Sequence, residues 1–461
     1  IKELLNSYAA AKGMRFFVTT GNHDPALPLG LVKKNTHFLA ADGSRVTRED
    51  SCAGYVSQME CYTDFGFFPR KDDCYWESPF TSYTYDKYAY EEACRESVLD
   101  KRTYTLCDSL TATDASYLVE PVDGLWLLAI DGGVYLPKEM KDGKWTYQGS
   151  SAGYNLVLKH KPFLLPWVRK VVEEARKRHK TLVAFSHYPL VDFNDGVSES
   201  VHRMWGDRRF DLHRVPEAEV SEAFLQAGLR LHFAGHMHVN DTGIWEGKDG
   251  KHLYNIQVPS IATYVPAYKI LTIESDEAFR VETVTLDTVT GFDSLFPLYR
   301  AEYQSDSLRG HSPVWNKEIL SARTYGEFCD YQFRDLVRLR FIPRDLPESW
   351  RACLDFTGAR MLKAVSGEDK ANNVNWTGWC MTDMVLDVYR LRYAERLALK
   401  DIPETRLAAY RYLFERARIS SLRSAEVEIV NGLGTLFLAF LNGEPCQNFV
   451  IDLEKDTITG D

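Results

Sequence analysis

Residues 15–25 read Arg15-Phe16-Phe17-Val18-Thr19-Thr20-Gly21-Asn22-His23-Asp24-Pro25. A short apolar run stops at Gly21-Asn22-His23-Asp24, and Pro25 then prevents a strand from continuing, because proline lacks the N–H that a sheet ladder needs. The pattern predicts a buried strand that delivers an amide, an imidazole and a carboxylate to its carboxyl end. Ligands bind at that edge of open α/β sheets, so this segment predicts a fold class and the place of a site.

Two later segments repeat the pattern of an apolar run that ends in histidine. Residues 181–185 lead into Ser186-His187-Tyr188-Pro189, and residues 231–234 lead into Gly235-His236-Met237-His238. Strands of such a sheet end at a common edge, so we expect the three motifs to lie together. Histidine nitrogen suits divalent first-row metals, and amide and carboxylate oxygens complete harder, mixed sites. The combination predicts one metal site built from three segments.

The remainder of the first 290 residues alternates between helical and strand patterns. Helical apolar spacing or capping signals favour helices at 1–12, 161–179 and 216–227. Alternating or continuous apolar runs favour strands at 115–119, 125–130 (which ends at Asp131), 253–258, 268–273 and 279–286. Helices that alternate with strands and are followed by a run of strands predict a layered α/β sandwich.

The sequence pattern changes after residue 290. Residues 291–313 are turn-rich and predict a linker, and helical periodicity dominates residues 314–461, notably at 383–399 and 404–419. A short strand is expected at 448–453. We therefore predict a first domain over 1–290 and a mostly helical C-terminal domain over 314–461 of unknown role. Within the first domain, residues 25–115 form an irregular insertion rich in aromatic residues and cysteine.

Composition places limits on function. The chain has 461 residues, which favours two domains, and its 45% hydrophobic and 26% charged residues are ordinary for a globular protein. The formal net charge of −10 argues against a nucleic-acid binder with a basic surface. This net charge does not exclude a small phosphorylated substrate, because bound metal ions supply local positive charge. No apolar run approaches the roughly 18 residues of a membrane-spanning helix.

The cysteines leave two interpretations open. Five of the nine crowd into the insertion, and no two are spaced as in a zinc ribbon. They form one or two disulfides in an exported protein, or they are scattered buried thiols. A location outside the cytoplasm is favoured, and the oligomeric state is open.

These motifs resemble those of the calcineurin-like metallophosphoesterase superfamily, which includes purple acid phosphatases and a class of cyclic-nucleotide phosphodiesterases. The resemblance rests on Gly21-Asn22-His23-Asp24, on His187 and on Gly235-His236-Met237-His238, and it spans residues 1 to about 288. Ser116-Tyr117 before the strand that ends in Asp131 is also similar. The resemblance implies an α/β fold, a four-layer α/β/β/α sandwich, and hydrolysis of a phosphate mono- or diester by hydroxide activated at two metals.

The resemblance also implies a role for each motif residue. Two divalent metal ions (Mn, Zn or Fe) are expected, with these ligands: Asn22, His187 and His236 for one ion and His238 for the other. His23 is expected beside the metals as a proton donor, oriented by Asp24. The superfamily needs an Asp-x-His and a Gly-Asp motif upstream of Gly21, and the 20 residues before Gly21 contain neither. We therefore expect that the chain lacks its natural start; otherwise the first metal is not held.

Other assignments compete with this one. A catalytically degenerate metal-binding or scaffold protein of the same fold is one alternative, and an interaction protein that works through its helical domain is another. Three further histidines are interpreted as structural: His202, His213 and His232. Asp131 caps its strand or supports the site, and Ser186 lacks the Gly-x-Ser-x-Gly elbow of a serine hydrolase. The aromatic insertion forms a substrate wall, or else it packs as core or lid.

Overall fold

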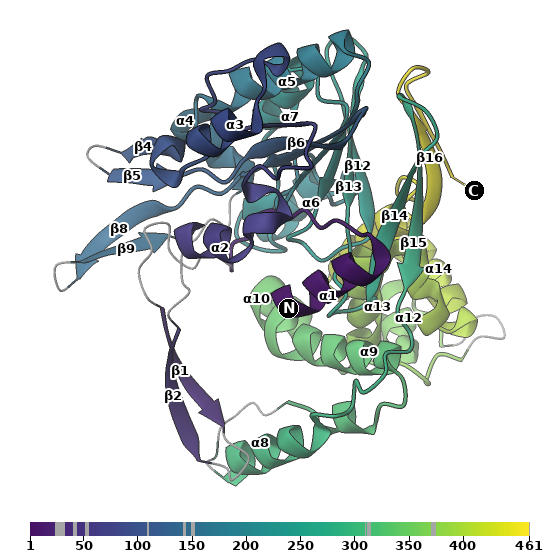
Figure 1. Ribbon diagram of the computed structural model, residues 1–461. Coiled ribbons are helices and arrows are strands. Elements are labelled where there is room, and N and C mark those ends of the chain that lie inside the picture. Colours follow the sequence, from purple (N-terminus) through teal and green to yellow (C-terminus); the bar gives the residue numbers. More distant parts are fainter. Residues whose placement is uncertain are drawn as a thin grey trace.

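The computed structural model describes residues 1–23, 33–39, 44–50, 55–107, 110–141, 144–148, 153–308, 310, 315–369 and 375–460. The chain forms a mixed α/β structure with a large sheet, a second smaller sheet and a helical C-terminal region (Figure 1). The ribbon of β1 (Lys33–Leu39) and β2 (Arg45–Asp50) projects away from the large sheet. The predicted α/β class is confirmed.

The large sheet has seven strands in the order β12-β13-β11-β10-β7-β6-β3. Its central strands β7, β10, β11 and β13 run parallel, so their carboxyl ends meet at one edge. β6 and β7 form the hairpin expected from the sequence, and β12, which was not expected, pairs antiparallel with β13. The bounds are β3 Tyr75–Glu77, β6 Tyr117–Val122, β7 Leu125–Ile130, β10 Thr181–Ser186, β11 Leu231–Ala234, β12 Asp241–Glu246 and β13 His252–Gln257.

The two faces of this sheet are covered differently. Helices α5 (Leu164–Lys177) and α7 (Ala218–Gln226) pack on one face through apolar residues such as Val168, Val171 and Phe224. The other face packs on the second sheet, of order β14-β15-β16-β17. The second sheet consists of β14 Ala267–Ile273, β15 Ala278–Thr285, β16 Asn448–Asp452 and β17 Thr457–Gly460. The predicted helices and strands of this region are confirmed, apart from shifts at their ends.

The strand predicted at residues 15–20 is wrong. Helix α1 (Lys2–Lys12) ends at Gly13, and residues 14–21 then run without regular structure and are mostly half-buried. The Val18 N–H donates to Phe65 O at 3.0 Å, and Val18 O accepts from Tyr117 Oη at 2.8 Å. The contact with β6 is thus made by the Tyr117 side chain and not by a backbone ladder, so the segment is not a strand of the large sheet.

The segment predicted to be an irregular insertion contains regular structure in its described part. It comprises α2 (Tyr55–Cys61), a π-helical turn (Thr63–Phe67), β3, α3 (Tyr90–Glu96) and the ribbon of β4 (Thr103–Cys107) with β5 (Leu110–Thr113). Tyr75, Trp76 and Tyr83 are buried in the hydrophobic cores on either side of the large sheet. These aromatic residues therefore pack as core, and a substrate wall is not supported for them.

Several short elements complete the part of the chain before the helical region. They are β8 Leu136–Lys141, β9 Lys144–Gln148, α4 Val157–His160, α6 Ser198–Trp205 and, within the predicted linker, α8 Phe296–Leu308. The helical region itself contains α9 Tyr325–Leu336, α10 Ile342–Asp345, α11 Glu348–Arg351, α12 Gly358–Ser366, α13 Met381–Ala394, α14 Glu404–Ile419 and α15 Ala425–Leu441.

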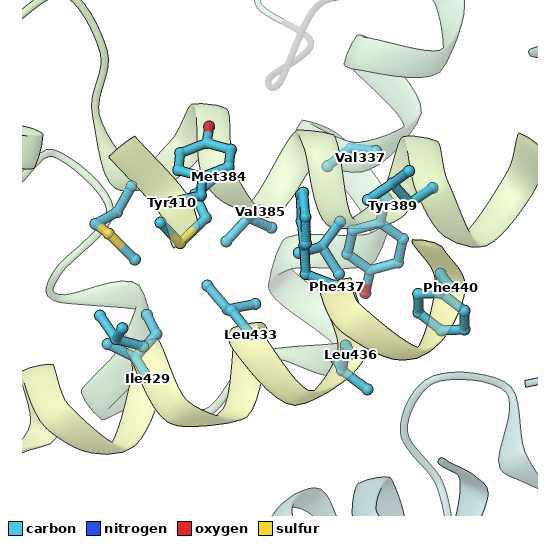
Figure 2. Packing of buried hydrophobic residues seen from close by; sticks show 14 of the residues in the cluster. Val337, Met384, Val385, Tyr389, Tyr410, Ile429, Leu433, Leu436, Phe437 and Phe440 are labelled. Atoms are coloured by element: carbon cyan, nitrogen blue, oxygen red, sulfur yellow. The ribbon is translucent and has the colours of Figure 1, made fainter. Parts of the chain in front are cut away.

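The helical region has one large hydrophobic core. Figure 2 shows Leu433 and Phe437 of α15 facing Val385 and Tyr389 of α13. Phe193, Val201, Met237 and Tyr264, which lie before residue 290, belong to the same core. The chain then returns to the second sheet, because β16 pairs with β15. The helical C-terminal region is confirmed, and its division from the first domain at 291–313 stays a prediction.

The eight described cysteines are free thiols, and Cys52 lies outside the described residues. Disulfides are therefore not formed among those eight. None of the helices in the described ranges has the length and apolar character that crossing a membrane requires. The cellular location stays a prediction.

Candidate metal centre

His187 and His236 lie at the carboxyl edge of the large sheet. β10 ends at Ser186 and β11 ends at Ala234, and these two residues pair in the parallel register. The next residues therefore lie side by side, and the Gly235 N–H donates to His187 O at 3.0 Å. The edge expected from the sequence is the edge on which the two histidines meet.

Three side-chain atoms converge there. His187 Nε2 lies 2.9 Å from Asn22 Oδ1 and 3.1 Å from His236 Nδ1. The single hydrogen on a neutral ring nitrogen does not satisfy both contacts fully. Adjacent ligands of a metal with bonds of about 2.1 Å lie about 3.0 Å apart at right angles, which agrees with both distances. These three residues therefore fit a metal ion held by two imidazoles and an amide oxygen.

The backbone of Gly235-His236-Met237-His238 is unusual. His236 has φ 67° and His238 has φ 59°, a left-handed conformation that non-glycine residues rarely adopt. The Met237 N–H donates to Gly235 O at 2.7 Å, and the Met237 side chain is buried in the core of the helical region. The helical region thus anchors a turn that holds two histidines in costly conformations, a feature that clusters at functional sites.

His236 is held as a neutral imidazole. Its side chain is 8% exposed, and burial, with smaller contributions from His187 and Arg214, lowers the pKa of His236 to about 2. Its Nε2 is buried and has no hydrogen-bond partner among the described residues. The neutral form is the form that binds a metal. The nitrogen that faces His187 is Nδ1, so Nδ1 is the atom that would bind the ion, and the unpartnered Nε2 is not satisfied by it.

His238 and His23 are exposed residues near this group. The surroundings of His238 lower its pKa, first by desolvation and then through the charges of Arg214 and His23. His23 is exposed and near enough to His238 for that effect. Asp24, the predicted partner of His23, lies outside the described residues. His238 is thus near His236, and His23 is near His238. The ligand role of His238 and the proton-donor role of His23 stay predictions.

Arg214 is a residue that the sequence did not reveal. It lies in a 3-10 helix (Leu212–Arg214) in the loop between α6 and α7. Its charge acts on both His236 and His238, and its Nε is 3.8 Å from Asp211 Oδ1. Loops at the carboxyl edge commonly carry binding residues, but nothing in the local sequence distinguishes Arg214 from the arginines beside it.

Asp131, which directly follows β7, is held by buried partners at this edge of the sheet. Lys161 Nζ lies 2.9 Å from Asp131 Oδ2 and donates to Asp114 Oδ2 at 2.8 Å, and all three side chains are buried. Thr20 Oγ1 donates to Asp131 Oδ1 at 3.4 Å, which ties the segment before Asn22 to β7. Asp131 is thus committed to Lys161 and Thr20, in agreement with a supporting role.

Two of the three histidines predicted to be structural, His232 and His202, have partners of their own. His232 is buried, with Nε2 2.9 Å from Ser186 Oγ and Nδ1 2.8 Å from Asn255 Oδ1. Burial lowers the pKa of His232 to about 4. The Ser186 hydroxyl donates to Tyr188 O, so it is not placed as a nucleophile. His202 is half-exposed and pairs with Asp207.

A different group of ligands lies in the region where the sheets meet the helices. Within the described ranges, one group of three acidic, cysteine or histidine side chains offers ligand atoms within 4.8 Å of one another: Asp195, Asp241 and Glu395. The group includes none of the predicted metal ligands.

Comparison with known proteins adds no relative to this description. A scan against protein-family models finds no match, and a search of curated proteins finds none either. The assignment of the histidine group therefore rests on its own geometry: an edge where parallel strands end, three converging ligand atoms and a strained turn.

Proposed function

We propose that this chain is a metal-dependent phosphoesterase that hydrolyses a phosphate mono- or diester. The observation that carries the proposal is the approach of His187 Nε2 to both Asn22 Oδ1 and His236 Nδ1 at the carboxyl edge of the large sheet. Two imidazoles and one amide oxygen suit a divalent first-row ion such as Mn, Zn or Fe. The proposal includes the four-layer sandwich of the calcineurin-like superfamily and a second ion on His238.

The ions would be held by Asn22, His187 and His236 on one side and by His238 on the other. When bound, such ions lower the pKa of a water molecule and offset the negative charge that develops on the phosphoryl oxygens. His187 and His236 bind in their neutral form, and burial already maintains that form in His236. The turn from Gly235 to His238 fixes the ligand directions before any ion arrives.

Two side chains would act on the substrate itself. The charge of Arg214 lies near enough to His238 to lower the pKa of that histidine. Arg214 would donate hydrogen bonds to phosphoryl oxygens, because guanidinium groups bind phosphate through paired hydrogen bonds. His23 is exposed beside His238 and would protonate the oxygen of the departing alcohol. A small phosphorylated molecule is the expected substrate.

The test measures hydrolysis of bis- and mono-nitrophenyl phosphate by the purified chain as Mn²⁺, Zn²⁺ or Fe²⁺ is added. We expect metal-dependent, saturable hydrolysis that is lost in His187→Ala and retained in the control His202→Ala, whose side chain lies on the surface. Metal binding without hydrolysis of either ester would instead favour the degenerate metal-binding protein. Hydrolysis that is unchanged in His187→Ala would contradict the proposal.

A further inference from the structure

Three carboxylates from distant parts of the chain meet near the candidate metal centre. Asp195 lies in the loop between β10 and α6, Asp241 is the first residue of β12, and Glu395 directly follows α13. Their ligand atoms lie within 4.8 Å of one another. The Asn240 N–H donates to Tyr393 O at 2.9 Å, so the start of β12 and the end of α13 are fastened together beside the group.

Two of the three carboxyl groups are buried, and none of the three is in contact with a cation among the described residues. Asp241 is 2% exposed and Glu395 is 4% exposed. None of the three carboxylates forms a salt bridge within the part of the chain that the structure describes. Desolvation, reinforced by the neighbouring carboxylates, raises the pKa of Asp195 to about 9, and burial raises the pKa of Asp241 to about 7. The fold therefore gathers three carboxyl groups without a contacting cation in the described chain, and protons take the place of that cation in the metal-free protein.

Polar atoms at this place also lack partners. Asp241 Oδ2 and Glu395 Oε1 are buried without a hydrogen-bond partner in the described chain. Gln257 is 0% exposed, and neither its Oε1 nor its Nε2 has a partner there. Gln257 pairs directly with Asp241 across β12 and β13, and such pairs place their side chains on one face. Unsatisfied buried oxygens of this kind point to a ligand that the side chains surround.

The nearest buried cation does not serve as that ligand. Lys269 Nζ donates to Asn240 Oδ1 at 2.7 Å, to Thr283 Oγ1 at 2.9 Å and to Cys446 O at 2.7 Å. Its three hydrogens are thus used on neutral oxygens. The thiol of Cys446 is also near, and burial raises the pKa of that thiol well above its usual range, so it stays protonated and is a poor metal ligand.

The backbone conformation of Glu395 also indicates a ligand site at this group. Its φ is 44°, a conformation in which L residues other than asparagine and aspartate are uncommon. The chain accepts this backbone at the point where α13 ends, and it thereby directs a carboxylate between the helical region and the sheet. A strained backbone conformation persists only where the surrounding contacts hold it in place, and such residues cluster at functional sites.

We propose that Asp195, Asp241 and Glu395 bind one hard divalent cation of the calcium class, with Gln257 within reach as a neutral oxygen ligand. The ligands are oxygens alone, which suits calcium better than zinc or iron. Calcium also accepts irregular sets of protein oxygens, whereas magnesium demands near-octahedral geometry and retains water. Three carboxylates and the Lys269 ammonium leave two negative charges, and a divalent ion balances them. The ion would fasten the helical region to the loop after His187 and to the strand after His238.

The test measures calcium binding and thermal stability of the whole chain after treatment with EDTA. We expect one Ca²⁺ per chain by calorimetric titration and a melting temperature that rises by a few degrees with Ca²⁺. Glu395→Gln and Asp195→Asn should weaken the affinity at least about tenfold and abolish the rise in melting temperature. If Glu395→Gln does not fold, Glu395→Asp provides the comparison, because it keeps the charge and only withdraws the carboxylate.

Two control variants locate the ion. Glu444→Gln removes an exposed charge close to Asp195 without removing a ligand, so calcium binding should be unchanged. His236→Ala disrupts the candidate metal centre and should likewise leave calcium binding intact. Absence of calcium binding by the wild-type chain would overturn the proposal. Equal binding by Glu395→Gln, or its loss in His236→Ala, would overturn it as well.

Discussion

The histidine group and the acidic group lie close together in the chain and differ in chemistry. His238 and Asp241 are only three residues apart. The histidine group offers neutral imidazole nitrogens and an amide oxygen, which favour first-row transition metals. The acidic group offers carboxylates alone, which favour calcium. In our proposals, one stretch of the fold therefore prepares two cation sites of opposite preference, one for hydrolysis and one that joins two regions of the chain.

The histidine group and the acidic group also differ in how deeply they are buried. Asn22 and His187 are half-buried and His238 is exposed, so the histidine group is open to solvent. Asp241 and Glu395 are buried between the sheets and the helical region. A site for reaction has to remain open, whereas an ion that joins two regions is best enclosed by them. Each prediction below tests one side of this contrast.

The largest effect is expected from His236→Ala. It removes a converging nitrogen, and we expect loss of the bound first-row metal and a fall in hydrolysis of about 10³-fold or more, since metal stabilisation contributes several kcal/mol. Elemental analysis and initial rates provide the measurement. His202→Ala serves as the matched control. A variant that kept both its bound metal and its rate of hydrolysis would contradict the assignment of the histidine group as a metal site.

The second effect concerns buried carboxylates that do have a cation. Lys161 is buried between Asp114 and Asp131, and these charges raise the pKa of Lys161 above its usual value despite burial. Lys161→Met leaves two carboxylates buried without a counter-charge, so the free energy of unfolding should fall by about 3–5 kcal/mol. Urea titration measures it, and Lys177→Met, on an exposed lysine, should change little.

Asp241→Asn is the counterpart of that experiment. In EDTA it removes a buried charge that has no salt bridge among the described residues, so the free energy of unfolding should stay the same or rise. A loss as large as that of Lys161→Met would mean that the acidic group is balanced from within the protein.

His23→Asn tests the exposed side of the histidine group. We expect alkyl phosphate esters to be hydrolysed about 10²-fold more slowly, because general-acid catalysis typically contributes that much or more. Nitrophenyl esters should be affected far less, since nitrophenolate departs without a proton. Steady-state rates on both classes of ester give the comparison. Equal losses on the two classes would contradict the role of His23 as acid.

The smallest effect is the pH dependence of calcium affinity. Desolvation raises the pKa of Asp195 to about 9 and the pKa of Asp241 to about 7, so both carboxyls hold protons below those values in the metal-free protein. Binding must release these protons, and affinity should therefore rise with pH between about 6 and about 9, by at most about tenfold per unit for each proton. Calorimetry in a pH series measures this change. Constant affinity over that range would contradict the assignment of the ligands.

Much of the fold could be predicted from the sequence, because its strands are apolar runs and its helices have a clear apolar face. The hairpin of β6 and β7, helix α14 and strand β16 are found where they were expected. The strand expected at residues 15–20 is absent, because the segment is held by single contacts to Phe65 and Tyr117 and not by a ladder, and its sequence does not encode those contacts. Strand β12 was missed because Asp241, Thr242 and Gly243 do not read as a strand.

The candidate site could be predicted only in part. Asn22, His187 and His236 were found because each follows an apolar run, a signal that is local in sequence. Arg214 and the acidic group carry no such signal. Asp195, Asp241 and Glu395 are brought together by the packing of the helical region on the sheets, and sequence spacing does not encode that packing.

Pulsed electron paramagnetic resonance of the Mn²⁺-loaded chain tests the central claim most directly, because it detects nitrogen atoms bound to the metal. We predict imidazole nitrogen coupling in the wild type and in Glu395→Gln, and its loss in the triple variant His187→Ala/His236→Ala/His238→Ala, which removes every proposed imidazole ligand. Mn²⁺ that binds without nitrogen coupling in the wild type, or coupling that persists in the triple variant, would contradict the account.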